Sequence, residues 1–303
     1  MNTNVIADTS NWMPLAFMGL LGLALLIYVI LDGYDLGVGI LLIAFPKAQG
    51  LILHALYGPV TLMLLGLILR GAAFDFRVKA HAQWKPLWDR AFSAGSLLAS
   101  LAQGWMLGRY VTGFAEGWAY TLFAACIALA LASAYALLGA GWLLMKTEGA
   151  LQLRAVAQAK RVWPAVVIGL ALISVTTPLV SPTVRARWFQ LPELIALLPI
   201  PLVTALALLA LRGLLNSHRV LGKACWAPFL LMVLVMLMGF FGLAYSLYPF
   251  VMVDRITVWQ AAAAPESLAF IGVGCAITVP VILAYTVFSY RVFWGKATEL
   301  LYA

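Results

Sequence analysis

The chain has 303 residues, of which 64% are hydrophobic and only 10% charged, and its mean hydropathy is +1.00. A soluble domain of this length would not tolerate such a composition on its surface, so a soluble globular protein is excluded and an integral membrane protein is predicted. We interpret the formal net charge of +8 as a feature of membrane topology, because the basic residues lie next to the ends of apolar stretches. Nucleic acid is therefore not an expected partner.

Eight long apolar stretches predict an all-α, polytopic membrane protein with about eight transmembrane helices. Nearly all of them reach the roughly 20 apolar residues that a helix needs to cross a hydrocarbon core. We expect a single transmembrane domain over residues 1–303, with pseudo-repeat halves 1–155 and 156–303, each a four-helix bundle, as a finer alternative. The stretches run over residues 13–44, 51–71, 91–109, 118–145, 162–181, 191–211, 224–249 and 267–290.

The first apolar stretch is too long for one straight span. As a continuous helix it would measure about 48 Å at 1.5 Å per residue, well over the thickness of the hydrocarbon core. We therefore expect a break near Gly37-Val38-Gly39. The following segment, residues 45–50, contains Pro46 and Gly50 and predicts a tight turn.

The distribution of basic residues predicts the orientation of the chain. If the eight stretches alternate across the membrane, fourteen of the nineteen Lys and Arg residues fall on one side. By the positive-inside rule this side is cytoplasmic, and an even number of spans places both termini there as well. The fourteen are Arg70, Arg77, Lys79, Lys85, Arg90, Lys146, Arg154, Lys160, Arg161, Arg212, Arg219, Lys223, Arg291 and Lys296.

Two acids interrupt the first apolar stretch and are the candidate site residues. Asp32 and Asp35 are three residues apart and share one helix face, while Gly33, Gly37 and Gly39 would let another helix approach closely. An acid at membrane depth is costly unless it is paired or hydrated, which favours a proton path or a subunit contact. An interfacial helix break whose acids meet water explains the same residues equally well.

Few residues could hold a metal or a haem. Of the three histidines only His54 lies within a stretch, and for it a carbonyl or hydroxyl partner is favoured over haem iron. Cys126, Cys225 and Cys275 lie singly in three stretches, so we expect free thiols. Glu193 is expected at the membrane interface. We predict no catalytic, cofactor-binding or metal-binding residue in this chain.

Six strings of residues, spread in order over nearly the whole chain, form a specific joint pattern. Three lie in the first third: Leu31-Asp32-Gly33-Tyr34-Asp35-Leu36-Gly37, Arg70-Gly71-Ala72-Ala73-Phe74-Asp75-Phe76-Arg77, and Leu87-Trp88-Asp89-Arg90-Ala91-Phe92 with Gly95-Ser96. Three follow: Gly141-Trp142-Leu143-Leu144-Met145-Lys146-Thr147-Glu148-Gly149, Pro265-Glu266-Ser267-Leu268-Ala269-Phe270, and Phe288-Ser289-Tyr290-Arg291-Val292-Phe293 with Gly295-Lys296. Together they strongly resemble subunit II of cytochrome bd-type quinol oxidases, especially the cyanide-insensitive branch.

The resemblance implies a non-haem subunit of a respiratory enzyme complex that oxidises quinol and reduces oxygen to water. This chain would support assembly and a proton or oxygen route, while haems b and d and the quinol site would lie in a haem-bearing subunit I. Further expected partners are a small accessory subunit, membrane lipids and a bound quinone. The expected location is the bacterial inner membrane, with several membrane passes.

One departure from the family pattern concerns the segment between Gly39 and Phe45. Family members have an additional stretch there with a Trp-Asp-Gly-Asn motif, whose acid is associated with proton transfer, and this chain lacks it. That role therefore transfers to no residue of this chain. The long first stretch followed at once by a turn favours an omitted piece over a naturally shortened chain.

A small polytopic secondary transporter is the alternative from another class. An eight-span bundle with a few buried acids is equally typical of transporters when the resemblance is set aside. Colour would distinguish the two, since an oxidase subunit purifies with a haem-bearing partner and a transporter does not.

Overall fold

The computed structural model describes residues 12, 14–20, 23, 46–180, 182–191, 193–252, 256–292 and 295–296. This part of the chain is almost entirely helical, which confirms the predicted polytopic helical membrane protein. The expected break near Gly37-Val38-Gly39 lies outside the described residues, as do Asp32 and Asp35.

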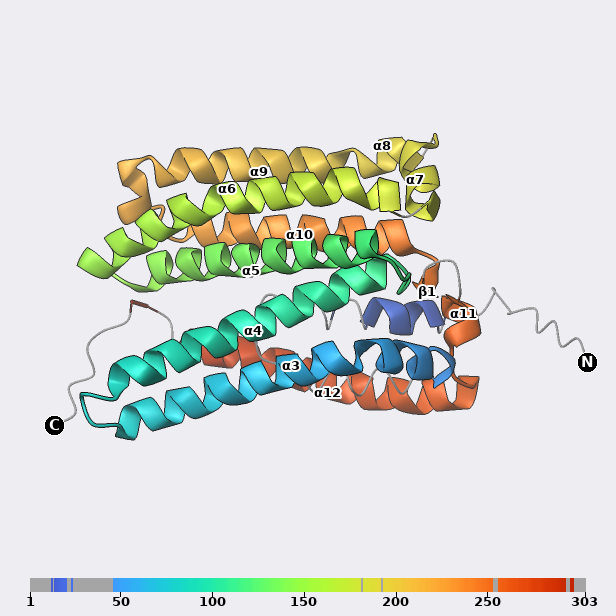
Figure 1. Cartoon of the computed structure of the whole chain (residues 1–303), viewed down its shortest axis with the longest axis horizontal. Coiled ribbons are helices and arrows are strands. Elements are labelled where there is room, and N and C mark those ends of the chain that lie inside the picture. Colours follow the sequence, from blue (N-terminus) through green and yellow to red (C-terminus); the bar gives the residue numbers. More distant parts are fainter. Residues whose placement is uncertain are drawn as a thin grey trace, which may run out of the picture.

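Long helices joined by short turns make up most of the described chain (Figure 1). Residues 14–20 are helical. The later elements are α3 (Pro46–Lys79), α4 (Lys85–Val111), α5 (Trp118–Lys146), α6 (Gly149–Val180), α7 (Pro182–Phe189), α8 (Glu193–Leu197), α9 (Pro199–Leu215), the 3-10 helix η1 (His218–Leu221), α10 (Ala227–Leu247), β1 (Phe250–Met252), β2 (Ile256–Thr257), α11 (Val258–Ala261) and α12 (Pro265–Val292). The sequence pattern does not anticipate the two strands, which pair antiparallel with Phe250 opposite Thr257.

Six of the predicted spans correspond to described helices that are long and apolar enough to cross a membrane. They are α3, α5, α6, the pair α8 and α9, α10, and α12. Helix α4 has 27 residues but falls short in hydropathy, because Ser93, Ser96, Ser100 and Gln103 lie in its middle. The first predicted span lies mostly outside the described residues, so the total of eight stays a prediction.

Two local expectations differ from the structure. Residues 46–50 open helix α3, so the predicted tight turn is wrong there: proline suits the first helical position, where its missing N–H and fixed φ cost nothing. Helix α6 begins at Gly149, well before residue 162, and extends the span through most of the polar connection. Residue 155 lies inside α6, and the division into halves 1–155 and 156–303 stays a proposal.

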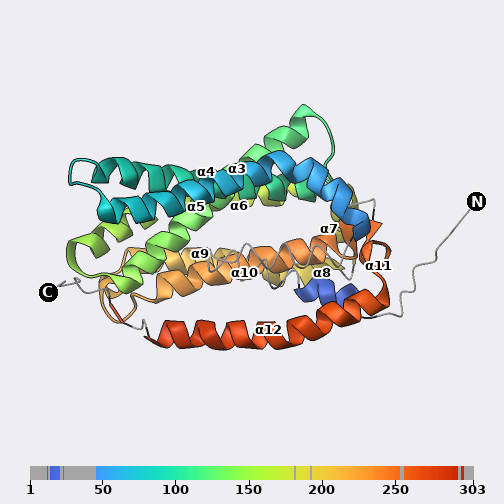
Figure 2. The same ribbon diagram turned by 90° about the horizontal axis from the view of Figure 1, so that it is seen from below.

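Helix α5 is central to the packing, because it contacts α4, α6 and α10. Its crossing with α4 is close: a Cβ added at Gly104 would lie 2.5 Å from the Ala128 Cα, and one added at Gly108 would lie 2.5 Å from the Ala124 Cα. Both helices therefore present small residues four positions apart, the spacing that lets membrane helices approach closely. Figure 2 shows α12 on the far side of the molecule from α3 and α4.

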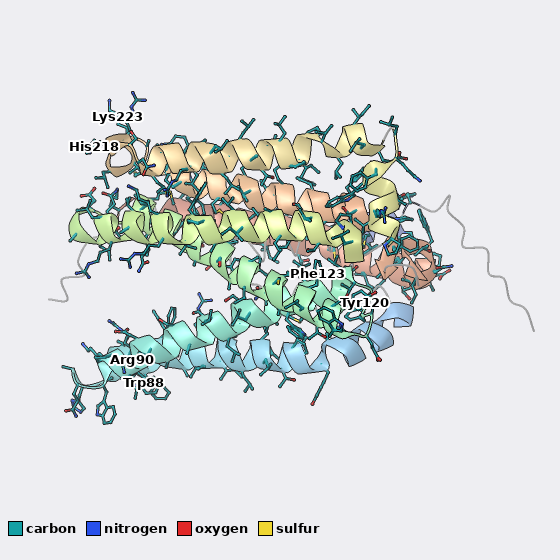
Figure 3. All side chains as sticks on the ribbon, turned by 45° about the horizontal axis from the view of Figure 1, so that its top comes forward. Trp88, Arg90, Tyr120, Phe123, His218 and Lys223 are labelled. Atoms are coloured by element: carbon teal, nitrogen blue, oxygen red, sulfur yellow. The ribbon has the colours of Figure 1, made fainter. Side chains whose placement is uncertain are left out.

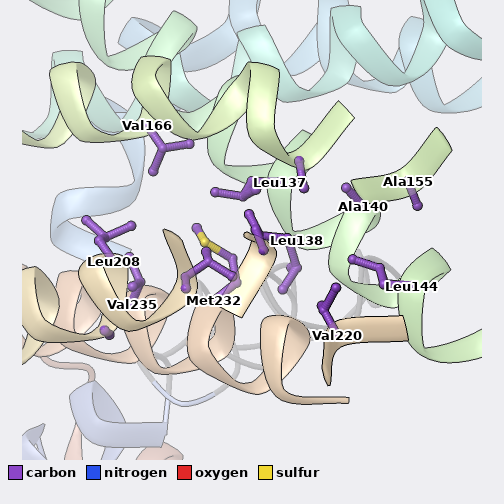
Figure 4. Close-up of a cluster of buried hydrophobic side chains, with 14 residues drawn as sticks. Leu137, Leu138, Ala140, Leu144, Ala155, Val166, Leu208, Val220, Met232 and Val235 are labelled. Carbon is purple, nitrogen blue, oxygen red and sulfur yellow. The ribbon is translucent and has the colours of Figure 1, made fainter. Parts of the chain in front are cut away.

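The largest buried cluster joins α5, α6, α9, η1 and α10 (Figure 4). Leu144, Leu211 and Met232 are among its fully buried side chains, and Val220 brings η1 into the same cluster. A second cluster, at the other end of the bundle, joins Phe17 to α4, β1, α11 and α12. These contacts set the relative positions of the helix ends.

Helices α3 and α12 expose long apolar faces. Only 11% of the most apolar window of α3 is buried inside the structure, and only 6% of that of α12. Phe270 and Ile277 of α12 are 83% and 64% exposed. Such faces are unfavourable in water, so they are surfaces for lipid or for another membrane subunit.

Candidate functional site

The turns that carry most of the basic residues lie at one end of the bundle. The α3–α4 turn, the α5–α6 turn, η1 and the end of α12 are together in Figure 1, and Figure 3 labels Arg90 and Lys223 at this end. The fourteen residues assigned to one membrane side by sequence lie in these elements or on the adjoining helices, within about twelve residues of them. Most of the basic residues thus lie toward one end of the bundle. We call this end, which includes the α3–α4 turn, the α5–α6 turn, η1 and the end of α12, the basic end.

The second and third of the six strings meet in the hairpin formed by α3 and α4. Arg77 forms an ion pair with Asp89, and the rings of Phe76 and Trp88 stack with their centroids 5.1 Å apart. The Arg70 guanidinium lies over the Phe92 ring, 5.4 Å from its centroid. Two strings that are separate in sequence therefore form one set of cross-hairpin contacts.

Glycine allows the two helices of the hairpin to touch through their backbones. A Cβ added at Gly95 would lie 2.6 Å from the Gly66 carbonyl oxygen, and one added at Gly66 would lie 2.7 Å from the Gly95 carbonyl oxygen. Real Cβ atoms do not approach backbone so closely, so any larger residue must push the helices apart. This explains why Gly95-Ser96 belongs to the same pattern as the charged and aromatic residues.

The fourth and sixth strings meet where α5 and α12 end. The Lys146 ammonium donates to the Gly295 carbonyl oxygen at 3.1 Å, and the Lys296 ammonium donates to the Thr147 carbonyl oxygen at 2.9 Å. Lys296 also lies 3.9 Å from the Glu148 carboxylate. The Trp142 ring is in edge contact with Tyr290, at 6.2 Å between centroids. These reciprocal bonds connect α12 to the rest of the basic end.

Two open hollows lie at opposite ends of the described bundle. One, of about 410 Å³, is lined by Lys79, His81 and Trp84 at the α3–α4 turn. The other, of about 550 Å³, lies between α8 and α10 and is lined by Glu193 and Tyr245 among others. Glu193 is half-buried at the first residue of α8, and its position at the membrane interface stays a prediction.

The predicted site residues lie outside the part of the chain that the structure describes, so their roles stay predictions. Asp32 and Asp35 lie outside the described residues, and the side chain of His54 does too, although its backbone belongs to α3. His81 and His218 are exposed at turns, so neither is placed to ligate a buried haem iron. Among the described residues no three His, Cys, Asp or Glu side chains form a group able to hold a metal ion.

Sequence reasoning missed the pairing of the strings. Arg77 and Asp89 flank a short polar turn between two helices, and opposite charges at that spacing were a usable signal for the ion pair. The pairing of Lys146 with Gly295 joins residues 149 positions apart, and no local signal could have predicted it.

Comparison with known proteins identifies the pattern that these junctions share. The sequence profile described as "Cytochrome bd terminal oxidase subunit II" matches residues 38–293, which is most of the chain. The chain belongs to this family. It is therefore a multi-pass membrane subunit of a cytochrome bd terminal oxidase, and its designation as subunit II implies a complex with subunit I. The transporter alternative finds no support in this match.

Two curated relatives agree with the family assignment. The chain is 26% identical to the "Probable cytochrome oxidase subunit 2" of Haemophilus influenzae, over 85% of this chain and 78% of that protein. It is 38% identical to the "Cytochrome bd ubiquinol oxidase subunit 2" of Bacillus subtilis over a shorter region, 22% of this chain and 20% of that protein.

The longer alignment also shows a difference in length between the two proteins. It spans 304 positions but only 85% of this chain of 303 residues. The Haemophilus influenzae protein therefore has residues within the aligned range that this chain lacks, and a missing segment between Gly39 and Phe45 stays a prediction.

Proposed function

We propose that this chain is the non-haem subunit II of a terminal oxidase that oxidises quinol and reduces oxygen to water, with haems b and d held by subunit I. The family match over residues 38–293 carries this proposal. A quinol as electron donor is supported by the name of the Bacillus subtilis relative, a ubiquinol oxidase subunit.

The main role that we assign to the chain is assembly with the haem-bearing subunit, with a small accessory subunit and bound quinone or lipid as further components. The apolar faces of α3 and α12 are long enough for packing against another membrane subunit, and exposed residues such as Ile68 and Phe270 lie on them. The two junctions at the basic end would hold these helices in a fixed relation while the complex forms.

Purification of the native complex through a tag on this chain tests the proposal. We expect the purified material to show the visible absorption of haems b and d, and mass spectrometry to identify a larger haem-bearing subunit. His54→Ala should leave the haem content unchanged. A colourless preparation that contains this chain alone would contradict the proposal, and loss of one haem's absorption in the His54 variant would show that this chain is a haem ligand.

Asp32 and Asp35 are proposed to serve a proton route or a subunit contact. If they carry protons, Asp32→Asn or Asp35→Asn should lower oxygen consumption while haem content and assembly stay near normal. If they are paired across an interface, the same change leaves a buried partner unpaired at a cost of about 3–5 kcal/mol, and assembly fails together with activity. The exposed Glu116 supplies the control Glu116→Gln, and unchanged activity and assembly in both Asp variants would eliminate both roles.

We place the chain in a bacterial inner membrane with its basic end and both termini in the cytoplasm. The fourteen-to-five distribution of Lys and Arg supports this orientation. A cysteine introduced as Ala82→Cys, in the turn between α3 and α4, should react with a membrane-impermeant thiol reagent only from the cytoplasmic side. Reaction from the outside of intact cells would reverse the orientation.

A further inference from the structure

One part of the basic end has cations and no acids. The sequence has no Asp or Glu from Gly149 to Pro192, nor from Leu194 to Val253, so α6, α9, η1 and α10 contain none. The same elements and the turn after η1 supply six of the fourteen basic residues: Arg154, Lys160, Arg161, Arg212, Arg219 and Lys223. We call the part of the molecule that carries these six residues the acid-free end.

Packing brings the cations of α6 and α9 together. Ala155 and Ala159 of α6 are buried in the same cluster as Leu211 and Leu215 of α9, so residues 154–163 of α6 lie alongside the last turns of α9. Where these two segments meet, the Arg212 guanidinium lies over the Trp163 ring, 5.1 Å from its centroid.

Two further features define the surroundings of the Trp163 ring. The Trp163 indole N–H donates to the Leu208 carbonyl oxygen at 3.0 Å, which fixes the ring between the two helices. Lys160 precedes Trp163 by three residues and therefore lies on the same side of α6.

Apolar side chains continue from these cations toward the middle of the bundle. On α6, Ile168 and Val175 lie eight and fifteen residues after Lys160, within about 80° of it around the helix, and they are 66% and 63% exposed. On α9, Leu209 lies three residues before Arg212 and is 63% exposed. Each helix thus presents a cation above an exposed apolar stripe, at the end of a membrane span.

We propose that the acid-free end binds the phosphodiester headgroup of an anionic phospholipid, with Lys160 and Arg212 beside the phosphate and the acyl chains along the apolar stripes of α6 and α9. The charge is complementary, since these cations lie on elements whose sequences contain no acid. A soluble anion would satisfy the cations but leave the stripes uncovered, whereas a phospholipid covers both. Trp163 lies near the start of the apolar stretch 162–181, a position typical of aromatic rings in the headgroup region.

Lipid retention by the purified complex tests this site. The complex, with whatever subunits accompany the chain, is exchanged into nanodiscs made of equal parts phosphatidylglycerol and phosphatidylcholine, returned to detergent and washed, and its bound lipids are measured by mass spectrometry. The variant Lys160→Gln with Arg212→Gln should retain less phosphatidylglycerol, by about fivefold for each charge removed, while phosphatidylcholine is unaffected. Haem absorption and thermal stability are measured on the same samples to show that the variant is folded and assembled.

A matched pair of substitutions in the α3–α4 hairpin controls for general membrane electrostatics. Lys79→Gln with Arg90→Gln removes two charges from the same membrane side, where Asp75 and Asp89 also lie, and it should change phosphatidylglycerol retention far less. Equal losses in both double variants, or no loss in the first, would overturn the site. Displacement of the retained lipid by inorganic phosphate alone would overturn it too, because the site would then recognise an anion and not a lipid.

Discussion

At the basic end, the α3–α4 hairpin and the acid-free end carry similar numbers of Lys and Arg, five and six, but they use that charge differently. In the hairpin, the chain itself supplies partners for two of the five cations, because Arg77 is paired with Asp89 and Arg70 lies over the Phe92 ring. In the acid-free end the elements supply no acid, and Arg212 is held by an aromatic ring instead.

The difference shows that a topological signal and a binding surface can have the same composition. The positive-inside rule counts cations and explains both regions equally well. Only the partners of each cation separate a region in which part of the positive charge is paired with acids of the same hairpin from one whose elements contain no acid. Four sets of substitutions test this distinction, beginning with the set for which we expect the largest effect.

Glycine substitutions should affect the two regions in opposite directions. In Gly95→Ala the new Cβ would lie 2.6 Å from the Gly66 carbonyl oxygen and 2.9 Å from the Arg70 backbone nitrogen, so the hairpin must open, at a cost of about 1–3 kcal/mol. In Gly213→Ala of α9 nothing lies within 4 Å, and the helix should gain up to ~1 kcal/mol from helix propensity. Thermal unfolding of the purified complex measures both; equal midpoints for the two variants would mean that the hairpin is not tightly packed.

Tryptophan substitutions compare how each region holds its aromatic ring. Trp163→Phe loses the hydrogen bond to the Leu208 carbonyl oxygen and weakens the contact with Arg212, so we expect a loss of about 1–2 kcal/mol in the free energy of unfolding. Trp88→Phe keeps a ring that can stack on Phe76 and should lose less. Unfolding curves of the two variants check the order, and a larger loss for Trp88→Phe would contradict it.

An acid introduced on α6 should make the acid-free end resemble the hairpin. Gln158 is exposed, four residues after Arg154 and three before Arg161, so Gln158→Glu can pair with both. We expect helix stability to rise by about 0.2–0.5 kcal/mol and phosphatidylglycerol retention to fall about fivefold. Gln158→Ala is the control for loss of the glutamine, and unchanged retention in Gln158→Glu would count against a role for net charge at this end.

A small effect, confined to stability, is expected where a surface ion pair is broken. The side chains of Arg77 and Asp89 are 49% and 53% exposed, so Asp89→Asn should cost only about 0.2–1 kcal/mol, less at high salt. A double-mutant cycle with Arg77→Gln isolates the pair. A coupling as large as the cost of Gly95→Ala would show that the pair is desolvated in the assembled complex.

Prediction from sequence was successful where hydropathy decides the outcome. The spans at 118–145, 224–249 and 267–290 lie within two or three residues of α5, α10 and α12, because a membrane helix ends near the point where its apolar residues end. It was less accurate where helices continue outside the apolar region: α6 extends thirteen residues before residue 162, since a polar helix in water costs little once it is nucleated.

The candidate site was less predictable than the fold. Sequence reasoning selected Asp32 and Asp35 by their depth, and their roles stay predictions because they lie outside the described residues. The contacts that the structure does describe, such as Lys296 with Thr147 and Arg212 with Trp163, join helices distant in the chain. No periodicity or motif spacing could have indicated them.

The sequence by itself determined the class of this protein, the six spans that correspond to described helices, and its family, because each follows from composition or from local strings of residues. Tertiary structure alone decided which cations are paired, where glycine permits backbone contact, and which helices expose apolar faces. The physical reason is that lipid provides little hydrophobic driving force between helices, so their arrangement depends on close packing and on polar contacts between distant residues.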